Sequence, residues 1–213
     1  MKSKKIIMTV LVVTIIGALA VGGTAAYFTD GEEKVNTFTV GDMDITLTES
    51  EWDDSSDGKN LVPGYETGKN PTVTAVEGDS YMRMTVEFVS NDNSEMTAAR
   101  AEKILETICF EGEQGVNDEL FVEDAARSNT SKRYYVYNGV FKENSTAVLF
   151  DTVRIPSQWN QADVAVLGEY KIVVKAEAIQ SANFNSAQEA FEALDGEIES
   201  GTAVNDYKTV GGK

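Results

Sequence analysis

The 213-residue sequence contains no histidine and one cysteine, Cys109. Without histidine the chain has no Ser-His-Asp triad, no HExxH zinc motif and no other metal site built on imidazole. A single cysteine excludes an intrachain disulfide and a thiolate metal cage. Cys109 lies in the short run Thr107–Phe110, which predicts a buried core residue rather than a bridge between chains.

Basic residues are also scarce. The chain has 18 lysines and arginines against 35 aspartates and glutamates, a formal net charge of −17. Because phosphate binding needs a basic face, this balance argues against nucleic acid as a partner, and against anionic lipid. We expect self-repulsion to keep the protein soluble, and self-association to increase with salt, divalent cations or acidification.

Long apolar runs are limited to residues 6–21, which follow three lysines and precede several small residues. This order is typical of a secretory signal peptide. Thr24 and Ala26 suit the two shallow pockets of a signal peptidase, which predicts a signal peptide over residues 1–26 and a mature chain beginning at Tyr27. Losing the three lysines changes the charge from −17 to −20. The alternative is a retained membrane anchor, because about 20 apolar residues span a bilayer; we expect membrane contact only during export.

Three N-terminal segments carry a family resemblance, namely Gly23–Asp30, Asn36–Gly41 and Asp42–Leu47. They resemble the start of the TasA and camelysin family, secreted proteins of Gram-positive bacteria that are processed by a SipW-type signal peptidase. Weaker similarity continues in four further segments: Leu61–Gly64, Lys69–Val73, Tyr81–Arg83 and Gly168–Gln180. The resemblance implies a jelly-roll-like sandwich, a SipW-type peptidase as a partner during export, and a place in the extracellular matrix or on the cell surface.

Alternating apolar and polar residues predict several strands. The clearest alternation covers residues 36–48 and 81–90. Three other stretches are predicted as strands: 71–75, as an edge strand that begins at its proline, 147–155 and 170–179. Asn138-Gly139 predicts a tyrosine-rich hairpin between Tyr134–Tyr137 and Val140-Phe141.

Two segments change to a helical period. Residues 94–108 are predicted as an amphipathic helix capped by Ser94, and Ser186–Glu189 forms a capping-box pattern that opens a helix over about 186–199. Residues 118–127 are predicted as a short helical turn, and 156–168 as a loop. The whole pattern predicts an all-β fold, an antiparallel jelly-roll-like or Ig-like sandwich with two peripheral helices. It predicts a single domain over 27–200 and a flexible polar tail over 201–213.

An acidic stretch beginning at Asp53 resembles the first half of a calcium loop, because Asp53, Ser55 and Asp57 alternate and Gly58 follows. The twelfth position is Gly64, which cannot supply the bidentate carboxylate. The two readings are a weak calcium site and a solvated acidic loop.

Aromatic residues gather at four positions: Tyr134, Tyr135, Tyr137 and Phe141. They fit either a carbohydrate or partner surface, or alternation between core and solvent in a hairpin. Core packing is the favoured interpretation.

No catalytic residues are predicted, because the many carboxylate pairs are expected by chance in so acidic a chain. We therefore expect a secreted structural subunit of biofilm-matrix or cell-surface fibres, with itself or a related fibre subunit as partner and no cofactor beyond weak calcium. The segment Tyr27–Phe38 is the expected donor strand, which pairs with an exposed sheet edge of a neighbour. Its apolar anchors are Tyr27, Phe28, Val35 and Phe38. The alternatives are a metallopeptidase, which the resemblance to camelysin implies, and a monomeric surface binding module.

Overall fold

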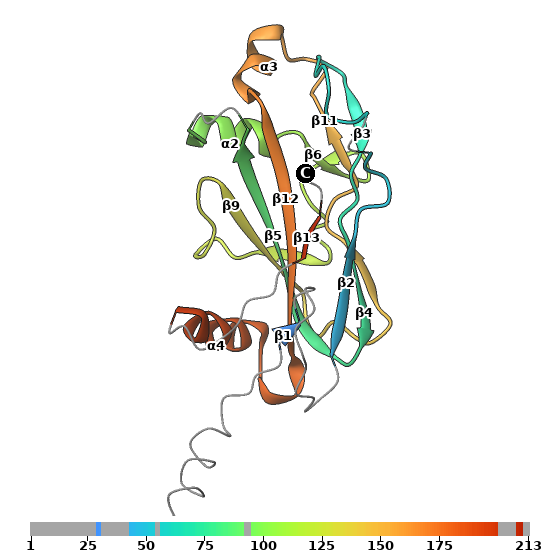
Figure 1. Cartoon of the computed structure of the whole chain (residues 1–213), viewed down its shortest axis with the longest axis vertical. Coiled ribbons are helices and arrows are strands. Elements are labelled where there is room, and N and C mark those ends of the chain that lie inside the picture. Colours follow the sequence, from blue (N-terminus) through green and yellow to red (C-terminus); the bar gives the residue numbers. More distant parts are fainter. Residues whose placement is uncertain (1–28, 31–42, 54–55, 92–94, 200–207, 211–213) are drawn as a thin grey trace, which may run out of the picture.

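The computed structural model describes residues 29–30, 43–53, 56–91, 95–199 and 208–210. Two layers of antiparallel strands face one another (Figure 1). The first layer is one sheet in the order β1-β12-β5-β9-β8, with β13 also on β12. Its strands are β1 (Thr29–Asp30), β5 (Ser80–Ser90), β8 (Phe121–Glu123), β9 (Lys132–Tyr137), β12 (Tyr170–Gln180) and β13 (Lys208–Val210).

The second layer is built from two small sheets, ordered β10-β4-β2 and β3-β11-β6-β7. Their strands are β2 (Asp44–Thr48), β3 (Glu66–Gly68), β4 (Thr72–Glu77), β6 (Ile108–Phe110), β7 (Glu113–Gln114), β10 (Thr146–Val148) and β11 (Thr152–Arg154). Only Lys69–Pro71 separates β3 from β4, and only Leu149–Asp151 separates β10 from β11. Backbone bonds from Lys69 N to Asp151 O (3.0 Å) and from Leu149 N to Pro71 O (3.1 Å) bridge this joint.

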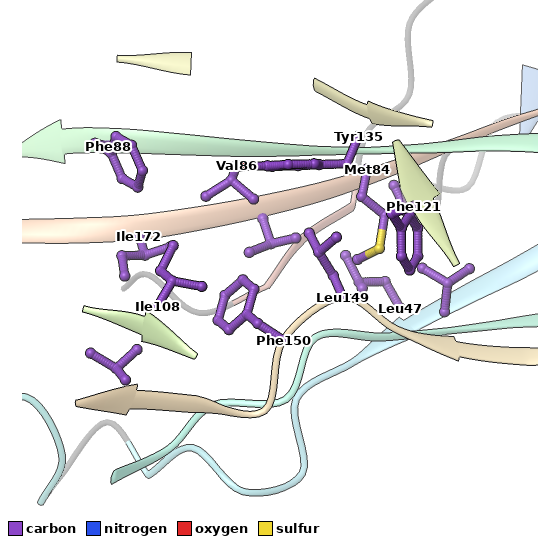
Figure 2. Close-up of a cluster of buried hydrophobic side chains, with 14 of the residues drawn as sticks. Leu47, Met84, Val86, Phe88, Ile108, Phe121, Tyr135, Leu149, Phe150 and Ile172 are labelled. Atoms are coloured by element: carbon purple, nitrogen blue, oxygen red, sulfur yellow. The ribbon is translucent and has the colours of Figure 1, made fainter. Parts of the chain in front are cut away.

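Strand alternation creates the core between the layers. Along β5, the side chains of Met82, Met84, Val86 and Phe88 are all at most 2% exposed. They face apolar side chains of the second layer, including Leu47, Leu149 and Phe150 (Figure 2). The predicted all-β antiparallel sandwich is confirmed.

Helix α4 (Ala187–Glu199) covers the outer face of the first sheet, after the short 3-10 turn η1 (Ser181–Asn183). Its residues Ala190, Phe191 and Leu194 pack on Tyr81 and Ile179. The predicted helix over 186–199 is thus confirmed. Of its predicted capping box, Ser186 Oγ accepts from Glu189 N (3.2 Å), whereas the Glu189 carboxylate accepts from Asn185 N (3.0 Å).

The predicted helix over 94–108 is shorter, because α2 spans Ala98–Leu105. Its cap is Thr97, whose Oγ accepts from Arg100 N (3.3 Å), rather than Ser94, which lies outside the described residues. Beyond the helix, Ile108 belongs to β6. The apolar period extends to Ile108 because Ile108 also packs in the core, but it does so from β6 and not from the helix.

A third helix was not predicted. Helix α3 (Gln161–Leu167) lies within the segment 156–168 that was expected to be a loop, so the described residues contain three α-helices rather than two. A full capping box starts it: Asn160 Oδ1 accepts from Asp163 N, and the Asp163 carboxylate accepts from Asn160 N (3.0 Å). The helix is too short for its apolar period to stand out.

The predicted hairpin at Asn138-Gly139 is wrong. Strand β9 pairs with β5 and β8, and not with the residues after the turn. Gly139 has a φ of +104°, as a turn glycine should, but the chain then carries Phe141 to a reciprocal pair of backbone bonds with Ser80 (2.7 and 2.9 Å). Pairing with the long strand β5 therefore overrides the local hairpin.

Three smaller predictions also differ from the structure. The turn expected over 118–127 contains strand β8, and the strand expected over 147–155 is broken into β10 and β11. Strand β4 lies between β10 and β2 instead of at an edge. Pro71 precedes β4, so its missing N–H removes no bond from the ladder. Within the segment predicted as a tail, Lys208–Val210 forms β13.

Candidate functional site

The outer edge of β12 is the candidate site. On one side β12 pairs with β5 along its full length. On the other side, the strands of the described residues that pair with it are β1, opposite Ala178-Ile179, and β13, opposite Val174–Ala176. Among the described residues, no strand lies beside Tyr170–Val173 on that side. An edge of this kind presents backbone donors and acceptors to another extended chain.

Strand β1 belongs to the segment Tyr27–Phe38 that was predicted to be the donor. Its residues Thr29 and Asp30 pair with Ile179 and Ala178 of the same chain. The structure therefore places the described part of this segment on a sheet edge. The predicted donor anchors lie outside the described residues, namely Tyr27, Phe28, Val35 and Phe38. The predicted cleavage residues Thr24 and Ala26 also lie outside them.

A cleft of about 800 Å³ lies beside the Tyr170 end of β12. Tyr170–Ile172 of the first sheet forms one wall, and residues of β3 and β11 in the second layer form the opposite wall. The cleft therefore separates the layers at the edge where β12 lacks a described neighbour. Its apolar and aromatic lining includes Trp52, Leu61, Tyr65, Val153, Val164 and Ile172.

The loop side of the cleft is tightly held. Lys69 is 2% exposed, and its Nζ lies 2.7 Å from Glu49 Oε2 and 4.6 Å from the centroid of the Trp52 ring. Gly58 N donates to Tyr65 Oη (2.9 Å). Gly58 has a φ of +69°, and a Cβ there would lie 3.1 Å from the Trp52 ring, so glycine suits this close approach. The loop side of the cleft is therefore formed by closely packed side chains.

Tyr170 lines the cleft and packs against the core. Burial raises its pKa to about 12, an effect that a hydrogen bond with Thr107 partly offsets. The phenol is therefore neutral at physiological pH. A neutral phenol that is hydrogen-bonded to Thr107 has no role as a general base.

The opposite end of β12 carries a buried charge cluster. Arg83 of β5 is 2% exposed; its Nε donates to Glu177, and its two terminal nitrogens donate to Asp195 of α4 (3.0 and 2.7 Å). Arg127 also contacts Asp195. The Arg83 guanidinium stacks on Phe191, 4.6 Å from the ring centroid. These contacts fasten α4 to the sheet with the buried charges paired, as burial requires.

The acidic loop is organised by its own backbone. Asp53 N donates to Asp57 Oδ2 (2.8 Å), and Asp53 O accepts from Asp57 N (2.8 Å). This pairing makes a turn and gives one Asp57 oxygen a partner within the loop. Ser55 lies outside the described residues, so weak calcium binding here stays a prediction.

The aromatic cluster divides between two faces. Tyr135 and Phe141 are buried in the core, and burial raises the pKa of the Tyr135 phenol. Tyr137 makes edge contacts with Phe141 (4.9 Å between centroids) and Phe121 (5.8 Å). Tyr134 lies on the other face, with its ring centroid 5.3 Å from the Arg83 guanidinium carbon. Core packing, the favoured interpretation, is confirmed for Tyr135 and Phe141.

Cys109 is buried and carries a free thiol, as predicted. Burial raises the pKa of this thiol above its usual range. A buried neutral thiol is a poor nucleophile and a poor metal ligand.

The N-terminal third of the chain is similar to a known protein family. A family model described as camelysin metallo-endopeptidase matches residues 1–75. The camelysin resemblance is confirmed over these residues. The matched region runs from the first residue through β2 and β3 into β4. No curated protein matches the chain.

The camelysin description implies a metal ion. The chain has no histidine, and the described residues contain no group of three or more cysteine, aspartate or glutamate side chains placed to hold a metal. The carboxylates of Glu177 and Asp195 both accept from Arg83. These residues do not provide the donor set of a zinc peptidase.

No helix in the described part of the chain is long and apolar enough to cross a bilayer. The N-terminal apolar run lies outside those residues, so the predicted signal peptide and its cleavage stay predictions.

The edge position of β12 was not predictable from its own residues. Its alternation indicated a strand, yet which neighbour it would lack depends on the order of all the other strands. The buried cations Lys69, Arg83 and Arg100 were also missed, because charged residues are expected to be exposed. Arg83 lies between Tyr81 and Thr85 on the face of β5 that points away from Met82 and Met84, and all three residues are buried.

Proposed function

We propose that this protein is a secreted structural subunit of extracellular fibres, on a cell surface or in a biofilm matrix, and that subunits join by donating the mature N-terminal strand. One observation carries this proposal: β1, which begins just after the predicted cleavage position, adds to the edge of β12. A segment that already pairs with this edge in its own chain has the backbone conformation needed to pair with the same edge of a neighbour.

Export is supported by the sequence and by the family match. The camelysin match includes the basic start, the apolar run and the small residues before Tyr27. On this proposal a SipW-type signal peptidase cuts before Tyr27 and so creates a free end for donation. Strand donation is a head-to-tail contact, and such contacts build an open filament when the rotation between subunits does not close a ring.

The test starts with the mass of the secreted product, which should correspond to a chain that begins at Tyr27. Electron microscopy of this product should then show filaments. A secreted species that retains the apolar run, or a mature chain that stays monomeric across pH, salt and calcium, would contradict the proposal.

Charge provides a second test. The pI of about 4.3 and the excess of acidic groups should make filament formation faster near pH 4–5 and at higher salt, because self-repulsion falls. Light scattering measures this rate. A rate independent of pH and salt would mean that apolar contacts alone control assembly.

A metallo-endopeptidase is the second candidate, favoured only by the description of the matching family. Incubation of the purified mature protein with casein, with and without a chelator, tests it. Cleavage that the chelator abolishes would support the peptidase. A monomeric binding module is the third candidate, favoured by the cleft of about 800 Å³.

A further inference from the structure

We propose that Asn138 is a self-modifying site: in the folded protein its side-chain amide is lost as ammonia, and the residue becomes aspartate or isoaspartate. The reaction takes place between two neighbouring residues, and water is the only co-reactant. The inference does not rest on the fibre function proposed above, because it concerns one turn within a single subunit.

The sequence offers one favourable position for this reaction. Asn138-Gly139 is the only Asn-Gly pair in the chain. In such a pair the backbone nitrogen of the glycine is close to Cγ of the asparagine, and the glycine has no side chain to shield that nitrogen. Asparagine is one of the thermolabile residues of proteins.

The fold leaves both reacting groups accessible. Asn138 and Gly139 are exposed. Within the described part of the chain, the Asn138 side chain makes no hydrogen bond and Gly139 N donates to no acceptor. Gly139 has a φ of +104°, and a Cβ built there would have no heavy atom within 4 Å beyond its chain neighbours. The reaction therefore breaks no protein hydrogen bond and displaces no packed side chain at Gly139.

The reaction has two steps. A solvent base removes the proton of Gly139 N, and this nitrogen attacks Asn138 Cγ. The new N–C bond forms as the bond from Cγ to Nδ2 breaks, so ammonia leaves and a cyclic imide remains. Water then opens the imide: cleavage at Cγ gives aspartate, whereas cleavage at the backbone carbonyl gives isoaspartate. No electrons are exchanged, and the rate should rise with pH because the first step is a deprotonation.

A second asparagine provides a control within the same chain. Asn144 is also exposed and precedes the small residue Ser145. Here, however, Ser145 N donates to Lys142 O (2.9 Å), and Asn144 Nδ2 donates to Glu143 Oε1 (3.3 Å). Both groups must first lose these partners. Asn138 should therefore convert about fivefold faster or more, from the free energy of one hydrogen bond alone.

The two products differ in their effect on the turn. Asn138 N donates to Leu120 O (2.8 Å), and Phe141 exchanges two backbone bonds with Ser80 (2.7 and 2.9 Å). The Phe141 side chain is fully buried and contacts the Tyr137 ring. Isoaspartate lengthens the main chain between these fixed points, because the chain then runs through the former side chain. Aspartate keeps the normal backbone, so the isoaspartyl form should be the less stable product.

Both products add a negative charge to one cleft. Asn138 and Gly139 line a cleft of about 760 Å³ between α4 and strands β8 and β9. Its charged lining residues are Glu123, Asp124, Arg127 and Glu192. Conversion increases the excess of carboxylates there. Because the amide does not form again, the converted fraction records the age of the protein.

Isotope labelling tests the site. The purified folded protein is incubated in heavy-oxygen water at neutral and at mildly alkaline pH, and its peptides are mapped by mass spectrometry. The Asn138 peptide should gain heavy oxygen faster at the higher pH, and faster than the Asn144 peptide. In urea, Asn138 should react at a comparable rate, whereas Asn144 should accelerate. Conversion of Asn138 in urea alone would overturn the proposal, and equal folded-state rates at both asparagines would refute the role of the free nitrogen.

Two variants separate the charge from the lengthened backbone. Asn138→Gln blocks the reaction, because its longer side chain must close a larger and less favourable ring, and Asn138→Asp carries the charge on a normal backbone. Thermal unfolding of incubated wild type should give a lower midpoint than fresh Asn138→Asp, while incubated Asn138→Gln should stay unchanged. The same decline in Asn138→Gln would place the damage elsewhere. Isoaspartate without any decline would refute the effect on the turn.

Discussion

The two ends of β12 differ in how far the rest of the chain covers them. At the Gln180 end, the chain uses its own parts: β1 lies on the edge, α4 covers the outer face, and Arg83 joins Glu177 to Asp195. At the Tyr170 end, a cleft opens between the layers, and no described strand covers the edge.

Helices α2 and α3 frame the open end without filling it. Arg100 of α2 is 6% exposed and donates to the backbone oxygens of Leu167 (2.7 Å) and Glu169 (2.8 Å), and to Ser90 Oγ (3.0 Å). The buried guanidinium thus ties α2, the end of α3 and the ends of β5 and β12 together.

The largest expected effect is at the closed end. Arg83→Met should lower the free energy of unfolding by about 3–5 kcal/mol, because it leaves the buried carboxylate of Glu177 without its cation. Chemical denaturation measures the change. Lys142→Met, which removes an exposed lysine paired with Asp79, is the matched control and should leave the midpoint unchanged. A small loss in Arg83→Met would mean that α4 is held by its apolar contacts alone.

A pH dependence distinguishes the open end. The pKa of Tyr170 is raised to about 12, so the folded state keeps a neutral phenol that the unfolded chain ionises near pH 10. This contribution to stability is complete below pH 10 and is lost as the pH rises through about 12. Between these values the wild type should lose about 2–3 kcal/mol more than Tyr170→Phe. Parallel losses in both proteins would show that Tyr170 is not buried as described.

The smallest effect concerns the frame of the open end. Asn160→Ala removes the capping box of α3 and should cost about 1 kcal/mol. Thermal unfolding measures it, with Gln158→Ala, an exposed residue outside the cap, as control. If α3 only frames the cleft, filament formation should change little. A large loss of filaments with little loss of stability would instead assign α3 a direct contact with a neighbouring subunit.

Periodicity predicted the parts of this fold that local residues determine. The alternation of Met82, Met84, Val86 and Phe88 identified β5, and the spacing of Ala187, Phe191 and Leu194 identified α4. It failed where distant pairing decides the outcome, as at Asn138-Gly139, where a strong turn signal leads not to a hairpin but to Phe141 beside Ser80.

The candidate site was predictable in part for the same reason. The donor segment has a local signature, since it follows a cleavage pattern and carries spaced aromatic residues. The acceptor edge has none, because a strand that pairs on one side and a strand that pairs on both can share the same alternation. The partners of Lys69, Arg83 and Arg100 come from elements far away in sequence, so their burial could not be read from their neighbours.

The most direct test of the account is deletion of residues 27–35 from the mature chain. The deletion removes β1 and most of the donor segment, but none of the strands between which the core forms. Circular dichroism should show the folded sandwich, and electron microscopy should show no filaments under conditions in which the intact mature chain assembles. Normal filaments from the deleted protein would contradict strand donation and would mean that subunits join through another surface.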